Sequence, residues 1–326
     1  MSPLMLLDTA SLYFRAFYGV PDRSEPGEPP RNAITGLVDM MTTLVNAHRP
    51  SGLIACWDDD WRPAFRVAAV PTYKAHRVAE EAAHEGDGGG GIAEEVPEAL
   101  NVQVPVIVEL LASIGIPRIG HPGYEADDVI GTLTERAREV GRPVLVVTGD
   151  RDLFQLVDDA AGITVLYTAR GGVRGADVVN EAFLQSAYGV GSGAAYADLA
   201  LLRGDPSDGL PGVKGVGEKT AAKLMAQYGS VAALQAAIAA GNPRRGPSAS
   251  ACSSPVTTST GPPPWSTWPA TSPSRGRSTA ESPNGSPTPA GWPTWCAPTD
   301  SPAFRACSRP SASRPSPADP PRRRRA

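Results

Sequence analysis

Two carboxylates directly follow one of the most apolar stretches of the chain. In "VVTGDRDLFQL", residues 146–156, Asp150 and Asp152 come after the apolar run 144–147. Two negative charges this close destabilise each other unless a cation lies between them. The spacing therefore predicts a bound metal ion.

The same pattern of an apolar run followed by acids occurs at two other places. "LMLLD" ends at Asp8, and "LIACWDDD" ends in three aspartates, residues 58–60. Helical periodicity lies between these runs, for example at 33–47 and 104–114. Strands that alternate with helices predict a parallel α/β sheet, whose strand ends face one ligand-binding crevice. We therefore expect the three acidic strand ends to converge there.

A further acidic group opens a predicted helix. "GYEADDVIGTLTERAREV" contains Glu125, Asp127 and Asp128, and the first and last of these share a helical face. Each acid alone has a structural explanation as a helix cap, a helix-dipole partner or a turn residue. Their repetition at three strand ends and one helix start favours a site for a hard cation such as Mg²⁺, which prefers carboxylate oxygens.

A glycine-rich stretch near residue 210 combines acids, glycines and lysines. "LRGDPSDGLPGVKGVGEKTAAKLMAQYG" contains Asp205 and Asp208, and a helix is expected to begin near Glu218. The residues of interest that follow the acids are Gly212, Lys214, Gly215, Gly217, Lys219 and Lys223. Glycines allow close approach of the backbone and outward N–H groups, which suits binding of a phosphate beside lysines.

Composition divides the 326-residue chain near residue 241. Residues 242–326 contain 19 of the 34 prolines and no Leu, Ile, Met, Tyr or Lys, which predicts a disordered tail. That tail has 11 Arg and three acids, a net charge of +8, so the total of −4 leaves −12 on residues 1–241. Such an acidic body suits a polyanionic partner only where bound cations neutralise part of the charge.

Other site types find no support in the sequence. The four cysteines form no C-x-x-C pair, and the histidines at 48, 76, 84 and 121 lack metal-ligand spacing. The N-terminus lacks the pattern of a signal peptide, and no run of 18 apolar residues occurs. We therefore expect a cytoplasmic protein without membrane contact.

Five segments together resemble the bacterial 5′–3′ exonucleases of the flap-endonuclease superfamily, including the nuclease domain of DNA polymerase I. They are "LLDTASLYFRAF", "WDDDWRPAFR" with "YKAHR", "GYEADDV", "TGDRDLFQL" and "GDPSDGLPGVKGVGEKTA", within residues 4–240. The resemblance implies a PIN-like α/β domain at 1–170 with a helical arch near 74–100. It further implies a helix-hairpin-helix subdomain at 171–241, ahead of the disordered tail at 242–326.

The resemblance also implies a metal centre. One group would comprise Asp8, Asp58, Glu125 and Asp127 with Asp128 adjacent, and a second would comprise Asp150, Asp152, Asp205 and Asp208. Two Mg²⁺ ions about 4 Å apart would clamp the scissile phosphate, with Mn²⁺ as an alternative ion. The ion that Asp150 and Asp152 share would relieve their repulsion.

Basic residues have separate implied tasks. Arg15, Arg66, Lys74 and Arg77 match positions that face the phosphate near the arch in relatives, with Lys74 stabilising the transition state. For Arg15 and Arg77, a solvated helix face is the alternative. The hairpin glycines and lysines would grip the duplex backbone without sequence preference. A K⁺ ion at the hairpin is a possibility that only the resemblance suggests.

Three departures from the family pattern stand out. Thr9 follows Asp8 where relatives often have glycine, and the arch contains the glycine-rich run 86–91. Nothing after residue 242 resembles the further helices of relatives. We interpret the tail as out-of-frame translation of a GC-rich gene, with a basic DNA-binding tail as the alternative.

The sequence thus predicts a monomeric, metal-dependent phosphodiester hydrolase of DNA replication and repair. It would act as a 5′–3′ exonuclease, preferentially on double-stranded DNA, and as a flap endonuclease on 5′ flaps. The alternative is a protein that binds DNA structures without cleaving them. Retention of every family carboxylate favours the enzyme, because a negative cluster facing phosphate has no use in a pure binder.

Overall fold

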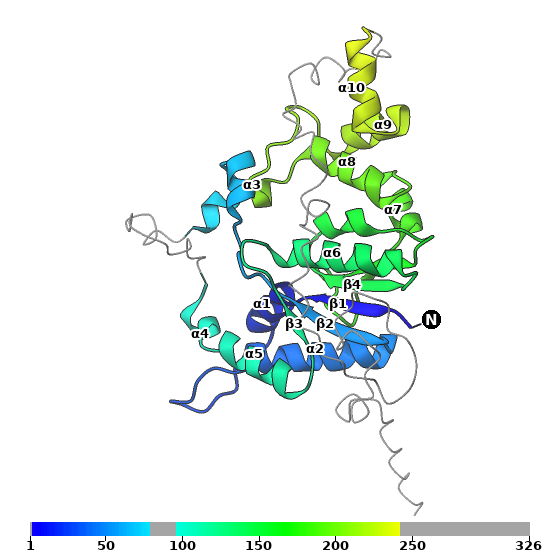
Figure 1. Cartoon of the computed structure of the whole chain (residues 1–326). Helices are drawn as coiled ribbons and strands as arrows, with labels where there is room; N and C mark the ends of the chain where they lie inside the picture. The colour runs from blue at the N-terminus through cyan, green and yellow to red at the C-terminus, as the bar shows by residue number, and fades with distance from the viewer. Residues whose placement is uncertain (1, 79–95, 242–326) are drawn as a thin grey trace, which may run out of the picture.

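The computed structural model describes residues 2–78 and 96–241 of the chain (Figure 1). Most of the predicted arch, and all of the predicted disordered tail at 242–326, lie outside the described residues. Within the described part, the expected alternation of strands and helices is present.

A six-stranded sheet forms the centre of the fold, in the order β3-β2-β1-β4-β5-β6. The strands are β1 (Leu4–Asp8), β2 (Gly52–Cys56), β3 (Arg118–Ile119), β4 (Val144–Thr148), β5 (Ile163–Tyr167) and β6 (Asp177–Val179). Every neighbouring pair is parallel except β5 and β6. This confirms the predicted parallel α/β class.

The strands are continuously apolar because both faces of the sheet are covered. All five residues of β1 are buried. Leu4 and Leu6 pack in the core on the side of α6 (Ala126–Glu139), whereas Met5 and Leu7 pack with residues of α2 (Asn32–His48) and α5 (Val104–Ser113). Because successive side chains of a strand point to opposite faces, β1 contributes residues to the cores on both sides of the sheet.

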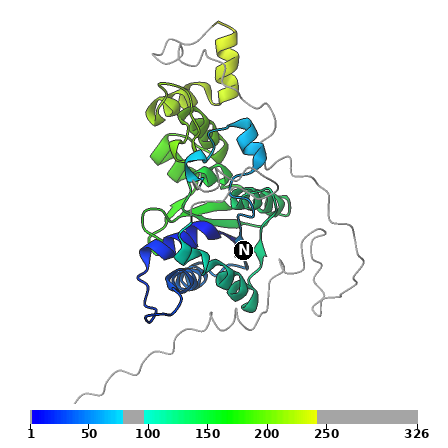
Figure 2. The same cartoon turned by 90° about the vertical axis from the view of Figure 1, so that its left-hand side faces the viewer.

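Helices lie on both faces, with a second helical layer beyond α6 (Figures 1 and 2). The remaining helices are α1 (Thr9–Gly19), α3 (Ala64–Ala69), α4 (Glu98–Asn101), α7 (Glu181–Tyr188), α8 (Gly193–Arg203), α9 (Glu218–Tyr228) and α10 (Val231–Ala239). Short 3₁₀ turns, η1 (Ala75–Arg77), η3 (Asp152–Leu156) and η4 (Pro206–Asp208), lie near the acidic strand ends. Across residues 2–78 and 96–241, no helix combines the length and apolarity needed to cross a bilayer.

Candidate metal and DNA site

Three acidic strand ends meet at one edge of the sheet, as predicted. β1 lies between β2 and β4, and Asp8 pairs in register with Cys56 at the end of β2. Asp58 follows β2 by two residues, and Asp150 follows β4 by two residues. Burial chiefly, and then the charge of Asp58, raise the pKa of Asp8 to about 7. The carboxylates therefore lie within electrostatic range of one another.

Asp8 also caps α1, so the structural explanation for this acid holds beside the functional one. Its carboxylate accepts hydrogen bonds from the backbone N–H of Ser11 at 3.2 Å and from the Thr148 hydroxyl at 2.7 Å. The side chain is only 7% exposed. A cap on a solvated surface helix would not need this burial, because the N–H donors require only an oxygen acceptor.

Thr148 links the acidic ends of β1 and β4, and the sequence reasoning missed it. Its hydroxyl donates to Asp8 and accepts from the backbone N–H of Asp150 at 2.9 Å. The next residue, Gly149, lies so close to α1 that an added Cβ would come within 2.6 Å of the Ser11 hydroxyl oxygen. The "TG" before Asp150 was the available signal, since a polar residue at a buried strand end needs a partner.

The acids at the start of α6 divide between capping and the acidic cluster. Glu125 and Asp128 form a reciprocal capping box, and Asp128 also accepts from Arg66 Nη2 at 2.7 Å. Burial raises the pKa of Asp127 well above its usual value, and the charges of Asp150 and Asp8 raise it further. Asp127 therefore faces the other carboxylates, while Asp128 is engaged by the cap and Arg66.

Glu125 is surrounded by donors from α3 and from the segment that follows it. Its carboxylate accepts from the Tyr73 hydroxyl, from Lys74 Nζ and from Arg66 Nη1, each at 2.8 Å. Burial alone would lower the pKa of Lys74, but the Glu125 carboxylate outweighs it and raises the pKa. Lys74 thus remains a cation beside the acidic cluster.

The second acidic group lies on η3 and η4 and on the residues directly before them. Burial, followed by the charges of Asp150, Asp205 and Asp208, raises the pKa of Asp152 to about 7. Burial also acts to raise the pKa of Asp205, but hydrogen bonds from Ser207 oppose it and the pKa is lowered. Asp208 accepts from Arg77 Nη2 at 2.8 Å.

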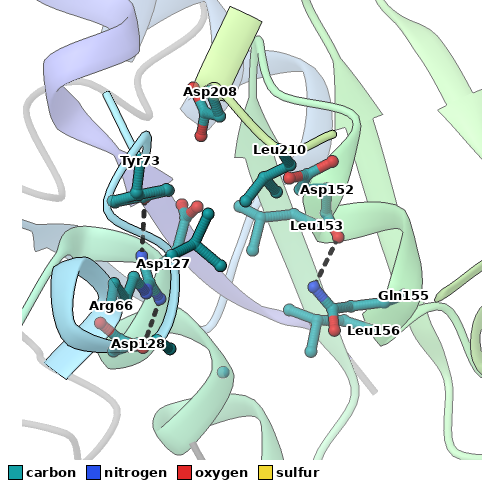
Figure 3. A pocket seen from close by; sticks show the side chains of 13 residues that line it. Arg66, Tyr73, Asp127, Asp128, Asp152, Leu153, Gln155, Leu156, Asp208 and Leu210 are labelled. Carbon is teal, nitrogen blue, oxygen red and sulfur yellow. Dashed lines mark hydrogen bonds and ion pairs between the residues drawn. The ribbon is translucent and has the colours of Figure 1, made fainter. Parts of the chain in front are cut away.

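A pocket of about 230 Å³ joins the two acidic groups (Figure 3). Asp127, Asp152 and Asp208 all line it. Its other walls include apolar side chains such as Leu153 and Leu210, together with polar ones such as Arg66 and Gln155. A negative, partly apolar cavity of this kind strengthens electrostatic interactions with a bound cation or phosphate.

The chemistry of these donors fits hard divalent cations. No three acidic, His or Cys side chains within 2–78 and 96–241 converge as a ready-made metal cage. Instead, Lys74 and Arg77 contact Glu125 and Asp208 directly. Several of these buried carboxylates raise one another's pKa, and such groups are the ones that a divalent cation stabilises.

Arg15 lies at the same edge of the sheet. Its guanidinium Nη2 is 3.8 Å from the position of a Cβ built on Gly149, and its Nε is buried without a hydrogen-bond partner. A buried donor of this kind differs from the solvated helix-face arginine of the alternative interpretation. Arg77 is 37% exposed and pairs with Asp208, so it too is partly engaged rather than freely solvated.

The glycine-rich hairpin has the backbone that its sequence predicts. Gly212 has φ +58°, and a Cβ there would come within 2.5 Å of the Arg203 carbonyl. α9 begins at Glu218 with Gly217 as its N-cap, in agreement with the sequence. Lys214, Lys219 and Lys223 are exposed around this turn. Exposed lysines beside a closely packed glycine turn suit contacts with backbone phosphates.

Known proteins resemble this chain over the same residues. Residues 3–189 match the family model for the 5′–3′ exonuclease N-terminal resolvase-like domain, and residues 192–249 match the 5′–3′ exonuclease C-terminal SAM fold. A 5′–3′ exonuclease of Streptomyces coelicolor is 60% identical over 72% of this chain and 75% of its own. DNA polymerase I of Mycobacterium bovis is 41% identical over 71% of this chain and 24% of its own.

A solved structure resembles the fold at low sequence identity. It is the flap endonuclease of bacteriophage T5, in a pseudo-enzyme-product complex with DNA and metal ions. The TM-score is 0.53 at 20% identity, over 71% of this chain and 77% of that chain.

Proposed function

The chain belongs to the 5′–3′ exonuclease family, and we propose that it removes nucleotides from 5′ ends of double-stranded DNA and also cuts 5′ flaps. Its 60% identity to a 5′–3′ exonuclease makes the exonuclease activity the established part. The placement of Asp8, Asp58, Asp127 and Asp150 at one sheet edge, where their charges act on one another, carries the proposal for this chain's own residues.

Two divalent ions, Mg²⁺ or Mn²⁺, would be held by the two acidic groups. Asp8, Asp58, Glu125 and Asp127 would form the first group, with Asp128 supporting Glu125 through the cap; Asp150, Asp152, Asp205 and Asp208 would form the second. When bound, the ions supply an activated water and stabilise charge on the scissile phosphate. In support, the T5 flap endonuclease was solved with metal ions.

The basic residues would act on the phosphate itself. Lys74 and Arg66 lie against Glu125 on the segment that leads to the arch, so each would approach a phosphate held over the carboxylates. A fixed cation stabilises the negative charge of a pentacoordinate transition state more than that of the ground-state phosphodiester. Arg15 would offer its unpartnered Nε to the same strand.

Residues 171–241 would bind the duplex as the helix-hairpin-helix subdomain. Contacts from Gly212, Gly215, Gly217 and the three exposed lysines would go to phosphates and carry no sequence preference. A single chain supplies both acidic groups and the hairpin, which supports a monomer as the active unit. K⁺ at the hairpin remains a proposal from the resemblance.

Cleavage of a 5′-flapped duplex, labelled at its 5′ end, tests the function. We expect release of short products with Mg²⁺, none with EDTA, and loss of cleavage in Asp150→Asn and Asp152→Asn with DNA binding retained or tightened. Asp39→Asn is the matched control, because Asp39 is 64% exposed and pairs only across the surface with Arg174. Equal binding with Mg²⁺ and EDTA, with no cleavage by the unmodified protein, would establish the DNA-binding alternative.

A further inference from the structure

We propose that Arg62 is a positioning residue that holds the backbone of Lys74 in the conformation from which its ammonium reaches the reacting phosphate. This inference rests on the proposed role of Lys74 in the nuclease site. The geometry of one peptide unit, between Tyr73 and Lys74, carries it.

Lys74 has an unusual backbone. Its φ of 46° and ψ of 23° lie in the left-handed region, which is unfavourable for a residue with a side chain. In residues 2–78 and 96–241 only Arg49 shares a positive φ among non-glycine residues. Arg49 is the C-cap of α2, where this conformation is common. Lys74 instead precedes η1, so surrounding contacts must hold it in place.

Both polar groups of the Tyr73–Lys74 peptide unit are held. The Tyr73 carbonyl accepts from Arg62 Nε at 2.7 Å, and the Lys74 N–H donates to the Asp208 carbonyl at 3.0 Å. The plane of this peptide unit sets φ of Lys74. Because its two ends are fixed by different segments of the chain, the plane cannot rotate to relieve the left-handed conformation without breaking a hydrogen bond.

Arg62 is itself fixed to the frame of the first acidic group. A second donor, Nη2, reaches the Pro71 carbonyl at 3.3 Å, and the Arg62 N–H donates to Asp60 Oδ1 at 3.1 Å. The Asp60 N–H in turn donates to the carbonyl of Tyr124, the residue before Glu125. Arg62 thus ties the Lys74 backbone to the loop that carries Glu125.

The neighbour of Arg62 contacts the other end of the same lysine. Lys74 Nζ donates to the Trp61 carbonyl at 3.4 Å as well as to Glu125 at 2.8 Å. Segment 60–62 therefore contacts both the peptide unit that precedes Lys74 and the ammonium of its side chain. A guanidinium is required for the backbone contact, because two separate carbonyls are bound by donors in one rigid plane, which a lysine cannot reproduce.

A competing role for Arg62 would be direct attraction of DNA phosphates from the protein surface. In that case its removal would weaken DNA affinity and reduce the salt dependence of binding by about one counterion. It would also act independently of Lys74. A positioning residue has the opposite signature, a loss of rate with unchanged affinity that depends on the lysine it positions.

A double-mutant cycle on the full chain separates the two roles. We would measure the single-turnover cleavage rate of a 5′-flapped duplex for the unmodified protein, Arg62→Ala, Lys74→Ala and the double variant. Arg62→Ala is expected to slow cleavage about 10- to 100-fold, the range for a displaced catalytic group. In the Lys74→Ala background the same change is expected to cost less than about threefold, because coupled residues are not additive.

Three further measurements complete the test. Arg62→Lys is expected to recover little of the rate, and Arg174→Ala, an exposed arginine, is expected to leave it unchanged. Binding to the same DNA in EDTA is expected to keep its affinity and salt slope in Arg62→Ala. If Arg62→Ala does not fold, as judged by thermal melting, Arg62→Lys and Arg62→Gln enter the cycle in its place.

The outcomes distinguish this inference from the proposed function. Absence of cleavage by the unmodified protein would overturn the function. Three results would each overturn the positioning role while leaving the function intact. They are normal cleavage by Arg62→Ala, an equal loss of rate on Arg62→Ala in both backgrounds, and weaker DNA binding with a smaller salt slope in Arg62→Ala.

Discussion

Asp8→Asn is expected to stabilise the metal-free protein at neutral pH while it destroys activity. Asp8 is buried, and desolvation together with the Asp58 charge raises its pKa from 3.8 to about 7. Its charged form is therefore unfavourable in the folded state. Asparagine removes that charge but keeps an oxygen for the Ser11 N–H, and it is as good an N-cap as aspartate.

The size of the effect follows from the two pKa values. One pKa unit corresponds to about 1.4 kcal/mol, so a rise from 3.8 to about 7 sets an upper limit on the order of 4 kcal/mol. Neighbouring carboxylates share protons with Asp8, which reduces the gain to roughly 1–4 kcal/mol. At about 2–4 °C per kcal/mol for a chain of this size, Tm should rise by roughly 2–16 °C.

The pH dependence of stability follows from the same two pKa values. The unfolded chain releases the Asp8 proton near pH 4, whereas the folded chain retains it to about pH 7. Stability of the unmodified protein should therefore fall as pH rises between these values and level off above them. The advantage of Asp8→Asn should be absent near pH 4 and complete by pH 8.

Thermal melting in EDTA from pH 4 to 8 measures the Tm difference between Asp8→Asn and the unmodified protein, with Asp39→Asn as the exposed control. Addition of Mg²⁺ at pH 8 should raise Tm of the unmodified protein more than that of Asp8→Asn, because the cation binds the folded carboxylates. A lower Tm for Asp8→Asn than for the unmodified protein in EDTA at pH 8 would refute the reasoning.

Two other predictions concern the segments that frame the site. Gly209→Ala should destabilise the protein by about 1–3 kcal/mol in chemical denaturation, because φ is +72° and the new Cβ would come within 2.1 Å of the Thr72 carbonyl. Gly123→Ala is the control for the cost of a positive φ alone, because Gly123 is exposed and has φ +81° with open space around it. Lys214→Ala and Lys219→Ala should each weaken binding of unrelated duplexes equally and lower the salt slope by about one. Titration at several salt concentrations measures both quantities. A loss of affinity for one DNA sequence only would contradict phosphate binding by the hairpin.

The sequence predicted the parts of the fold that depend on local pattern. Continuous apolar runs predicted β1 and β4, and the repeat of acids after them predicted which edge of the sheet holds the site. The predicted helices at 33–47 and 104–114 correspond to α2 and α5 to within a residue at each end. Local periodicity suffices here because each element buries its own apolar face against the sheet.

Contacts across long sequence separations were beyond the same reasoning. The Thr148 hydroxyl meets Asp8 across 140 positions, and Lys74 meets Glu125 across 51. The threonine before Gly149 signals that a buried polar group needs a partner but does not say which one, and a left-handed lysine has no local signature. Only the tertiary arrangement of β1 beside β4, and of the segment after α3 beside α6, creates these pairs.

The acidic cluster is neutralised in two different ways, and each predicts a different response to cations. Asp8 and Asp152 have pKa values raised to about 7, so a cation that binds them displaces protons. Glu125 and Asp208 are paired with Lys74 and Arg77, so a cation there competes with a side chain and frees it for phosphate. The cation therefore has two effects on the site. It stabilises the carboxylates, and it makes the two basic groups available to the DNA strand. Binding of the metal should accordingly release protons below about pH 7 and should favour DNA binding most where Lys74 and Arg77 are both present.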